Sequence, residues 1–516
     1  MNRLERSSVN MLSSMAGYVV PMLVALITTP FLLHELGEAA YGLQSLVAVI
    51  IGYLTFMDMG LDFPITKLLA EDRARQDAEA ESHLLSTTLQ LYGVIGLVGM
   101  SGIALLAGWF ARSVFQVPAE LQTDAVTVFR LAGIGFLGSM GMSWGRSVAA
   151  GLQRFDLAYS VSVVLSTSGT LIGLGAVFAG FGVVGYVLTR TACTLLAGPI
   201  YYILTRRVLP GYGFRPGLHR RTLHRVRGYV GYGAFNRTIS SLVSRLDQTV
   251  IGISAGVAAA GVYAVPFMVV HSVVYMVALM LGFTFPMASE LQSLGQMDRL
   301  RDIYIRASRF IAALAGLSFI PLFVLGDRIM AIWTPSIASQ ASGVLRLLAL
   351  AGYIGTLAAT LTNNLMVGLG RMRQFTIYAT TRAVVLTALC LALIPPLGLQ
   401  GAGWALLLTC GVDVVYFIVA LRRYFLVSPL VLVRVAYLKP VLLAGGLGGL
   451  ALLLRPLANS WLGLGAVGAM LVLAYVAAGF LVGVFGEMEK RAIAGLVQMA
   501  LRRLKRAPIP GGGRRG

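Results

Sequence analysis

Charged residues are scarce in this 516-residue sequence: Asp, Glu, Lys and Arg make up 12% of it, whereas hydrophobic residues make up 57%. The mean hydropathy is +0.80. Soluble domains carry about 25% charged residues, so an ordinary soluble enzyme or binding domain is excluded. Cysteine is scarce as well. The three cysteines all fall within apolar runs and cannot form a disulfide framework, which argues against redox chemistry.

Signatures of catalysis are also missing. The sequence contains no HExxH zinc motif and no phosphate-binding P-loop, and its five histidines are scattered. GIGFLG (residues 133–138) fits the GxGxxG pattern of dinucleotide-binding enzymes, but it lies within an apolar run that no strand precedes. Close packing of helices explains those glycines better. We therefore expect no catalytic residues, no metal and no cofactor.

Long apolar runs are abundant. Runs of about twenty residues, each able to cross a ~30 Å hydrocarbon core, recur from one end of the chain to the other, and we count about fourteen. This pattern predicts an all-α membrane protein with about fourteen transmembrane helices. The chain is then an integral membrane protein along its length rather than a soluble domain on a membrane anchor.

Basic residues outnumber acidic ones by 41 to 21 and gather in alternate connections, for example at Arg73, Arg154, residues 206–227, Arg299 and Arg371. They are spread between the spans, so no nucleic-acid partner is expected. By the positive-inside rule these connections and both termini are cytoplasmic. For the longest basic connection we favour a topology anchor over a binding site for anionic lipid or a lipid-linked phosphate.

Two sequence repeats divide the chain into halves. GEAAYG (residues 37–42) aligns with GVAAAG (residues 256–261), and GLQRFD (residues 151–156) aligns with GLGRMR (residues 368–373) at nearly the same spacing. Such repeats predict two pseudo-symmetric six-helix lobes around a central cleft, followed by two C-terminal helices. The boundaries we assign are an N-lobe at 1–210, a basic cytoplasmic linker at 211–227, a C-lobe at 228–424, the last two helices at 425–489, and a basic cytoplasmic tail at 490–516.

The predicted seventh span carries charge among apolar neighbours, as SLVSRLDQTVIGISAG (residues 241–256) shows. When successive side chains are placed 100° apart, its polar residues share one half of the helix: Asn236, Arg237, Ser240, Ser241, Ser244, Arg245, Asp247 and Gln248. A charge at the bilayer centre costs roughly 2.5 kcal/mol or more, so this half should border a hydrated cavity. The alternative is that its charges are buried in structural pairs between helices.

Other apolar runs contain charges too. Guanidinium groups suit a diphosphate because they form paired hydrogen bonds with it. The predicted substrate-binding residues are Arg237, Arg245, Arg130, Arg190, Arg382, Asn236, Ser240 and Ser244. Carboxylates in the membrane can bind a proton or a cation, or pair with arginine. The predicted ion-coupling residues are Asp58 and Asp62, which lie four apart on one helix face, together with Asp247 and Asp413. Arg146, near the cytoplasmic end of its span, fits either the cleft or an interface anchor.

Four stretches of the sequence resemble a known family. They are LGEAAYGLQSL (residues 36–46), DMGLD (residues 58–62), AGLQRFD (residues 150–156), and AAGVYAVP (residues 259–266) after Asp247. Together they are similar to the polysaccharide transporter branch, with its Wzx-type O-antigen flippases, of the multidrug/oligosaccharidyl-lipid/polysaccharide exporter superfamily. The resemblance implies two six-helix bundles with a central cleft and two extra helices. It also implies transfer of undecaprenyl-diphosphate-linked oligosaccharide from the cytoplasmic to the periplasmic leaflet.

The functional expectation is a multi-pass flippase of the bacterial inner membrane that works by alternating access. Its substrate is expected to be an O-antigen, capsule or exopolysaccharide repeat unit, and either protons or sodium ions are candidate coupling ions. Expected partners are the lipid-linked glycan and membrane lipids, with a polysaccharide polymerase and chain-length proteins as candidates. Two alternatives stay open: an ion-coupled multidrug exporter, which should meet organic cations with acids and aromatics, and a non-transporting scaffold of a polysaccharide synthase complex, which needs no polar cleft.

Overall fold

The computed structural model describes residues 3–58, 60–227, 245–282 and 284–484, and within these ranges the ordered elements are helices. The first half contains α1 (Arg3–Leu54), α2 (Asp62–Ala74), α3 (Ala78–Trp109), α4 (Gln122–Gly151), α5 (Phe155–Ala176), α6 (Gly182–Leu195), α7 (Ala197–Val208) and α8 (Arg220–Arg227). The second half contains α10 (Leu246–Ser254), α11 (Gly256–Met280), α12 (Thr284–Ser293), α13 (Met297–Trp333), α14 (Ala338–Gly355), α15 (Leu361–Gly368), α16 (Met372–Leu397) and α17 (Leu399–Ala420). It continues with α18 (Pro429–Leu432), α19 (Leu438–Leu454) and α20 (Trp461–Leu481).

Eleven helical segments in the described ranges are long and apolar enough to cross a membrane. Two of them contain a sharp turn and are long enough for two crossings each. In α1 the turn is at Gly37 (φ 74°), and in the segment Phe155–Val208 it is at Gly180 and Gly182 (φ 86° and 57°). A further predicted span falls at residues 228–254, where α10 is the described part. The prediction of an all-α membrane fold is confirmed.

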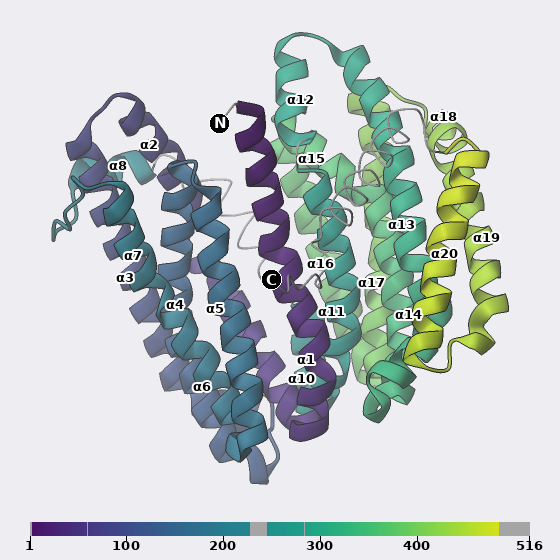
Figure 1. The fold of residues 1–516 in the computed structure, drawn as a ribbon, viewed down its shortest axis with the longest axis horizontal. Helices are drawn as coiled ribbons and strands as arrows, with labels where there is room; N and C mark the ends of the chain where they lie inside the picture. The colour runs from purple at the N-terminus through teal and green to yellow at the C-terminus, as the bar shows by residue number, and fades with distance from the viewer. Residues whose placement is uncertain (1–2, 59, 228–244, 283, 485–516) are drawn as a thin grey trace, which may run out of the picture.

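The helices form two bundles that Figure 1 shows side by side, with α2–α8 in one and α10–α20 in the other. The first helix of α1 runs between them, beside α11 and α5. Helices α19 and α20 lie on the outer side of the second bundle, where Tyr475 Oη donates to the Ala313 carbonyl oxygen of α13 at 2.8 Å. Helices α2, α8, α12 and α18, which flank basic connections, lie at the same end of the molecule.

The internal repeat is visible in the backbone. Four residues with positive φ in the first half have counterparts with positive φ 216 to 219 positions later. The pairs are Gly37 and Gly256 (74° and 88°), Gln76 and Gly295 (57° and 67°), Gln153 and Gly370 (56° and 66°), and Gly182 and Gly398 (57° and 56°). The two halves therefore turn in the same way at corresponding helix ends, which confirms the predicted pseudo-symmetry of the lobes.

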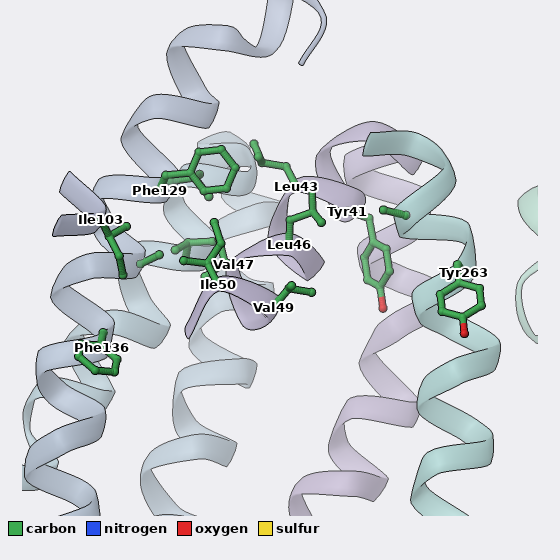
Figure 2. Packing of buried hydrophobic residues seen from close by; sticks show 14 of the residues in the cluster. Tyr41, Leu43, Leu46, Val47, Val49, Ile50, Ile103, Phe129, Phe136 and Tyr263 are labelled. Carbon is green, nitrogen blue, oxygen red and sulfur yellow. The ribbon is translucent and has the colours of Figure 1, made fainter. Parts of the chain in front are cut away.

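The closest crossing between the bundles involves Gly42 of α1 and Gly261 of α11, which are equivalent positions in the two repeats. A Cβ atom on Gly42 would lie 1.9 Å from the Val257 carbonyl oxygen, and one on Gly261 would lie 2.8 Å from the Gly42 Cα atom. Equivalent residues that contact each other mark a two-fold axis, so the pseudo-symmetry axis passes through this crossing. Tyr41 of α1 and Tyr263 of α11 lie on these two neighbouring helices, as Figure 2 shows.

Glycines also bring helices together within the N-lobe. A Cβ atom on Gly133 of α4 would lie 2.8 Å from the Met100 carbonyl oxygen of α3, and one on Gly138 would lie 2.8 Å from the Leu195 nitrogen at the end of α6. Both glycines belong to GIGFLG. Helix packing as the role of this motif is confirmed.

The basic linker is attached to the N-lobe rather than free. Arg225 of α8 forms a bidentate ion pair with Asp72 of α2, with Nη2–Oδ1 at 2.6 Å and Nη1–Oδ2 at 3.1 Å. Upstream, the Arg215 backbone nitrogen donates to Ser86 Oγ at 3.0 Å, and the Gly217 nitrogen donates to Gln90 Oε1 at 3.0 Å. Residues 215–227 thus continue the packing of the first bundle.

We predict that Gly42→Ala destabilises the folded protein by about 1–3 kcal/mol, since the added methyl group overlaps backbone atoms of α11 that cannot move independently. Thermal unfolding in detergent measures the effect. Gly93→Ala in α3 is the matched control, because a Cβ atom at Gly93 meets nothing within 4 Å. Equal stability of the two variants would contradict the close crossing.

Candidate functional site

A cavity of about 420 Å³ lies within the C-lobe, between α10, α11, α14, α16 and α17. Its volume is in the range of small-molecule binding sites. Apolar residues form much of its wall, and the polar groups that face it are Asp247, His271, Thr356, Thr360, Asn363, Tyr378, Arg382 and Asp413. The predicted polar site in this half of the chain is therefore a hollow within one lobe.

Asp413 of α17 is the most enclosed of these charges, with 1% of its surface exposed. Arg382 Nε donates to its Oδ1 at 2.9 Å, and Tyr378 Oη donates to the same oxygen at 2.7 Å. Tyr378 and Arg382 are four residues apart on α16, so they share one helix face and converge on one carboxylate. Asp413 and Arg382 therefore form a structural ion pair between two helices, which is the alternative that the sequence left open.

Asp247 is stabilised differently. It is 2% exposed, and its carboxylate accepts hydrogen bonds from Tyr263 Oη of α11 and, at 2.8 Å, from the Gln248 backbone nitrogen. It also lies in the first turn of α10, where the positive end of the helix dipole favours a negative charge. The two hydrogen-bond donors in the described residues are a hydroxyl and an amide, and the nearby Arg245 interacts with the carboxylate through its charge.

Arg245 immediately precedes α10 and is not helical, with φ −135° and ψ 13°. Our placement of Arg245 and Asp247 on one continuous helix is therefore wrong: the helix begins at Leu246. The Arg245 guanidinium lies over the Phe267 ring, 5.6 Å from its centre, and Nη1 donates to Gln248 Oε1 at 3.4 Å. His271 stacks on the same ring at 5.3 Å, which connects Arg245 to the wall of the cavity.

A smaller cavity of about 170 Å³ lies in the N-lobe and contains both Asp58 and Asp62. We predicted that these two acids share one face of a continuous helix, and this prediction is wrong. Asp58 ends a short helical turn, Gly60 has φ 69°, and α2 starts at Asp62, so the helix is interrupted between the two acids. The turn folds back through a hydrogen bond of 2.9 Å from the Gly60 nitrogen to Asp58 Oδ1, and both carboxylates still reach the same cavity.

The remaining predicted residues are not gathered at either cavity. Arg130 of α4 and Arg190 of α6 are exposed side chains of the N-lobe, and Arg190 lies 5.6 Å from the Tyr186 ring centre. Neither lines the C-lobe or the N-lobe cavity. Asn236, Arg237, Ser240 and Ser244 lie outside the described residues.

Tyrosine and asparagine side chains at the C-lobe cavity were missed. Tyr263 and Tyr378 supply the hydroxyls that hold the two acids, and Asn363 faces the cavity. A tyrosine within an apolar run is counted as a hydrophobic residue, so its hydroxyl is overlooked as a hydrogen-bond donor. The spacing of four between Tyr378 and Arg382 was the signal available in the sequence.

In the described part of the chain, no group of three or more His, Cys, Asp or Glu side chains is placed to hold a metal ion. The charged residues that line the C-lobe cavity are Asp247, Asp413 and Arg382, and Arg245 lies over the Phe267 ring of its wall.

Residues 8–292, more than half of the chain, match the protein family described as "Polysaccharide biosynthesis protein". The chain belongs to this family. It is similar to a probable flippase, AglR of Haloferax volcanii, with 23% identity over 76% of this chain and 78% of that protein. A putative O-antigen transporter of Shigella flexneri is 20% identical over 56% of this chain and 68% of its own length.

Solved structures share the fold. The lipid II flippase MurJ in an inward-closed conformation superposes with a TM-score of 0.68 at 10% identity, over 92% of this chain and 98% of its own. An inward-facing multidrug resistance transporter of the MATE family, from the MOP superfamily, gives 0.63 at 14% identity, over 86% and 99%. The chain is thus a multi-pass membrane protein with the fold of that superfamily, as the resemblance implied.

We predict that the Arg382–Asp413 pair shows energetic coupling of about 1–3 kcal/mol in a double-mutant cycle. Asp413→Asn leaves a guanidinium without its carboxylate, and Arg382→Gln leaves a carboxylate that is 1% exposed without its cation, so each single change destabilises the protein. The double variant should unfold at a temperature no lower than that of the less stable single variant. Additive effects on the unfolding temperature would exclude a coupled pair.

Proposed function

We propose that this protein is a flippase that moves polyprenyl-diphosphate-linked oligosaccharide, such as an O-antigen, capsule or exopolysaccharide repeat unit, from the cytoplasmic to the periplasmic leaflet. Membership in a family of polysaccharide biosynthesis proteins supports the substrate class. Similarity to a probable flippase and to a putative O-antigen transporter supports the activity. The lipid-linked glycan and membrane lipids are the partners that this function requires.

One observation carries the proposal: the Arg382 guanidinium lines a cavity inside apolar helices, and the Arg245 guanidinium lies over Phe267, a ring of its wall. Arg382 lines the C-lobe cavity, 30% of its side chain is exposed, and its bond to Asp413 uses Nε. Because a guanidinium has five N–H donors, its Nη groups can meet a phosphate oxygen while Asp413 stays bound. Arg245 contacts a ring and an amide and interacts with the charge of Asp247, and a guanidinium with five N–H donors has further donors for an anionic substrate.

The alternatives explain this arrangement less well. An exporter of organic cations needs carboxylates that are free to meet the drug, but Asp247 and Asp413 already accept hydrogen bonds from tyrosines and, for Asp413, from an arginine. A non-transporting scaffold has no use for charged groups around a cavity in the membrane, where each of them costs free energy.

We further propose that transport proceeds by alternating access. The bundles meet closely where Gly42 crosses Gly261, and their ribbons diverge toward the end that carries α2, α8 and α12 (Figure 1). Rocking of one pseudo-symmetric lobe against the other about such a crossing exchanges the accessible side. The basic connections gather at the diverging end, so we assign that end to the cytoplasm of a bacterial cell and the protein to its inner membrane.

The function is tested with proteoliposomes that contain a fluorescent undecaprenyl-diphosphate-linked oligosaccharide. We predict that Arg245→Gln flips it at less than about a tenth of the wild-type rate. Loss of one charge-assisted hydrogen bond costs about 1.5–3 kcal/mol, and ~1.4 kcal/mol is tenfold. Arg245→Lys should be partly active because it keeps the charge without the paired donors.

Arg112→Gln, which changes an exposed arginine away from both cavities, is the control for these variants. It should flip at the wild-type rate. If Arg245→Gln at equal protein level matches wild type, Arg245 does not bind the diphosphate. If wild-type protein flips no lipid-linked glycan but moves an organic cation, the drug-export alternative is correct.

Asp247 and Asp413 are the proposed coupling residues of the C-lobe, with protons or sodium ions as the coupling ion. They face one cavity, and each is held by a tyrosine hydroxyl that can exchange with a bound ion. We predict that Asp247→Asn abolishes the acceleration of flipping by a proton or sodium gradient and leaves the fold intact. Flipping rates with and without each gradient provide the measurement. If flipping still depends on the gradient in each of the Asn variants of Asp247, Asp413, Asp58 and Asp62, the coupling residues lie elsewhere.

A further inference from the structure

The end of α7 and the basic linker after it concentrate positive charge on the N-lobe. Residues 206–227 contain seven arginines and no acidic residue. Two of these arginines meet acids of the N-lobe: Arg225 pairs with Asp72, and Arg215 Nη1 lies 3.5 Å from Glu79 Oε1. The other five are exposed at the surface: Arg206, Arg207, Arg220, Arg221 and Arg227.

Helix α8 divides its residues between two faces. Thr222 and Val226, four residues apart and therefore on one face, are buried, and the helix lies beside α3. Arg220, Arg221 and Arg227 are exposed. The packed face fixes α8 on the bundle, so the guanidinium groups of the other face are directed away from it.

Two large apolar side chains are exposed next to these arginines. Phe214 is 44% exposed and Leu218 is 50% exposed. The backbone that carries them is fixed to α3, because Gly217 N donates to Gln90 Oε1 at 3.0 Å and Gln90 Nε2 donates to the Arg215 carbonyl oxygen at 3.3 Å. A fixed backbone thus presents apolar and cationic groups together on one surface.

This surface lies at the depth where the membrane begins. Gln90 directly precedes the uncharged residues 91–111, which as a helix span about 31 Å, close to the thickness of the hydrocarbon core. Gly217, which is bonded to Gln90, therefore lies at the boundary between head groups and acyl chains. Figure 1 shows α8 and the loop before it on the outer side of the first bundle, away from α10–α20. The surface accordingly faces the surrounding lipid.

We propose that the linker surface, formed by Phe214, Leu218 and the five exposed arginines, is a docking surface for anionic phospholipids of the cytoplasmic leaflet. The two apolar side chains enter the boundary below the head groups, and the guanidinium groups bind head-group phosphates. Anionic lipids complement a surface without acidic residues, whereas zwitterionic lipids also carry an ammonium group. Lipid binding adds to the role of topology anchor that the sequence favoured, and it does not depend on the substrate that the protein transports.

The docking surface is tested by titrating the full-length protein in detergent with phosphatidylglycerol or with phosphatidylcholine of the same acyl chains. Native mass spectrometry counts the bound lipids. Wild-type protein should bind phosphatidylglycerol about tenfold more tightly, equivalent to ~1.4 kcal/mol. The double variant Arg220→Gln/Arg221→Gln should reduce this preference to about twofold or less. Arg371→Gln/Arg373→Gln removes the same charge from exposed positions of a C-lobe connection and should keep the preference.

The apolar part of the surface has its own expectation. Phe214→Ser/Leu218→Ser should weaken the binding of both lipids to a similar extent and keep the preference, because it removes apolar contact with the acyl chains and leaves the arginines in place. Full retention of affinity for both lipids in this variant would contradict insertion at the boundary.

The remaining outcomes decide the proposal. If wild-type protein binds both lipids equally, or if Arg220→Gln/Arg221→Gln behaves like the C-lobe control, the docking surface is wrong. A variant with a lowered unfolding temperature is replaced by Arg206→Gln/Arg207→Gln, which changes the same surface and carries the same expectation. If Arg220→Gln/Arg221→Gln loses affinity for undecaprenyl diphosphate but not for phosphatidylglycerol, the surface recruits the transported lipid and phospholipid docking is wrong.

Discussion

The contact of Gly42 with Gly261 is the constraint on which the arrangement of the two lobes depends. Two helix backbones approach there so closely that a methyl group on either residue would overlap the other helix. Since the two glycines are equivalent in the internal repeat, the contact places the pseudo-symmetry axis, and with it every other pair of corresponding helices. It also positions the site, because Tyr263, which donates to Asp247, follows Gly261 by two residues on α11.

Three acids of the membrane segments show how the fold accommodates charge. Asp413 has a guanidinium and a tyrosine, Asp247 has a tyrosine and a helix N-terminus, and Asp327 of α13 is bridged to Arg346 and Arg455 from two other segments. Each acid is bound by donors from a neighbouring element, so each also ties helices together. Arginines such as Arg245 and Arg382 keep donors to spare, and this asymmetry makes an anion the complementary substrate.

The sequence was sufficient for the features that depend on one span at a time or on repetition. Apolar runs gave the helices, and GEAAYG with GVAAAG gave the equivalence of Gly42 and Gly261. It did not show that these glycines touch, since an alignment contains no packing. Nor did it show that Tyr378 and Arg382 meet Asp413 on the next helix, because a partner on another helix leaves no local periodicity. Placing side chains 100° apart gave wrong helix faces near Arg245 and Gly60. This placement assumes an unbroken helix, and the backbone interrupts the helix at both residues.

The two cavities belong to different lobes, and this separation has a consequence for transport. Under the flippase proposal, Arg382 of the C-lobe cavity takes the diphosphate, while the N-lobe cavity lies in the other bundle near the cytoplasmic end. A ligand shifts a conformational equilibrium only by its difference in affinity for the two states. A substrate that contacts both lobes gains affinity when they close around it, whereas a lipid diphosphate without its sugar contacts mainly one lobe. Closure would then favour a substrate that reaches both lobes, and selectivity would arise from the step that moves the lobes rather than from the first binding event.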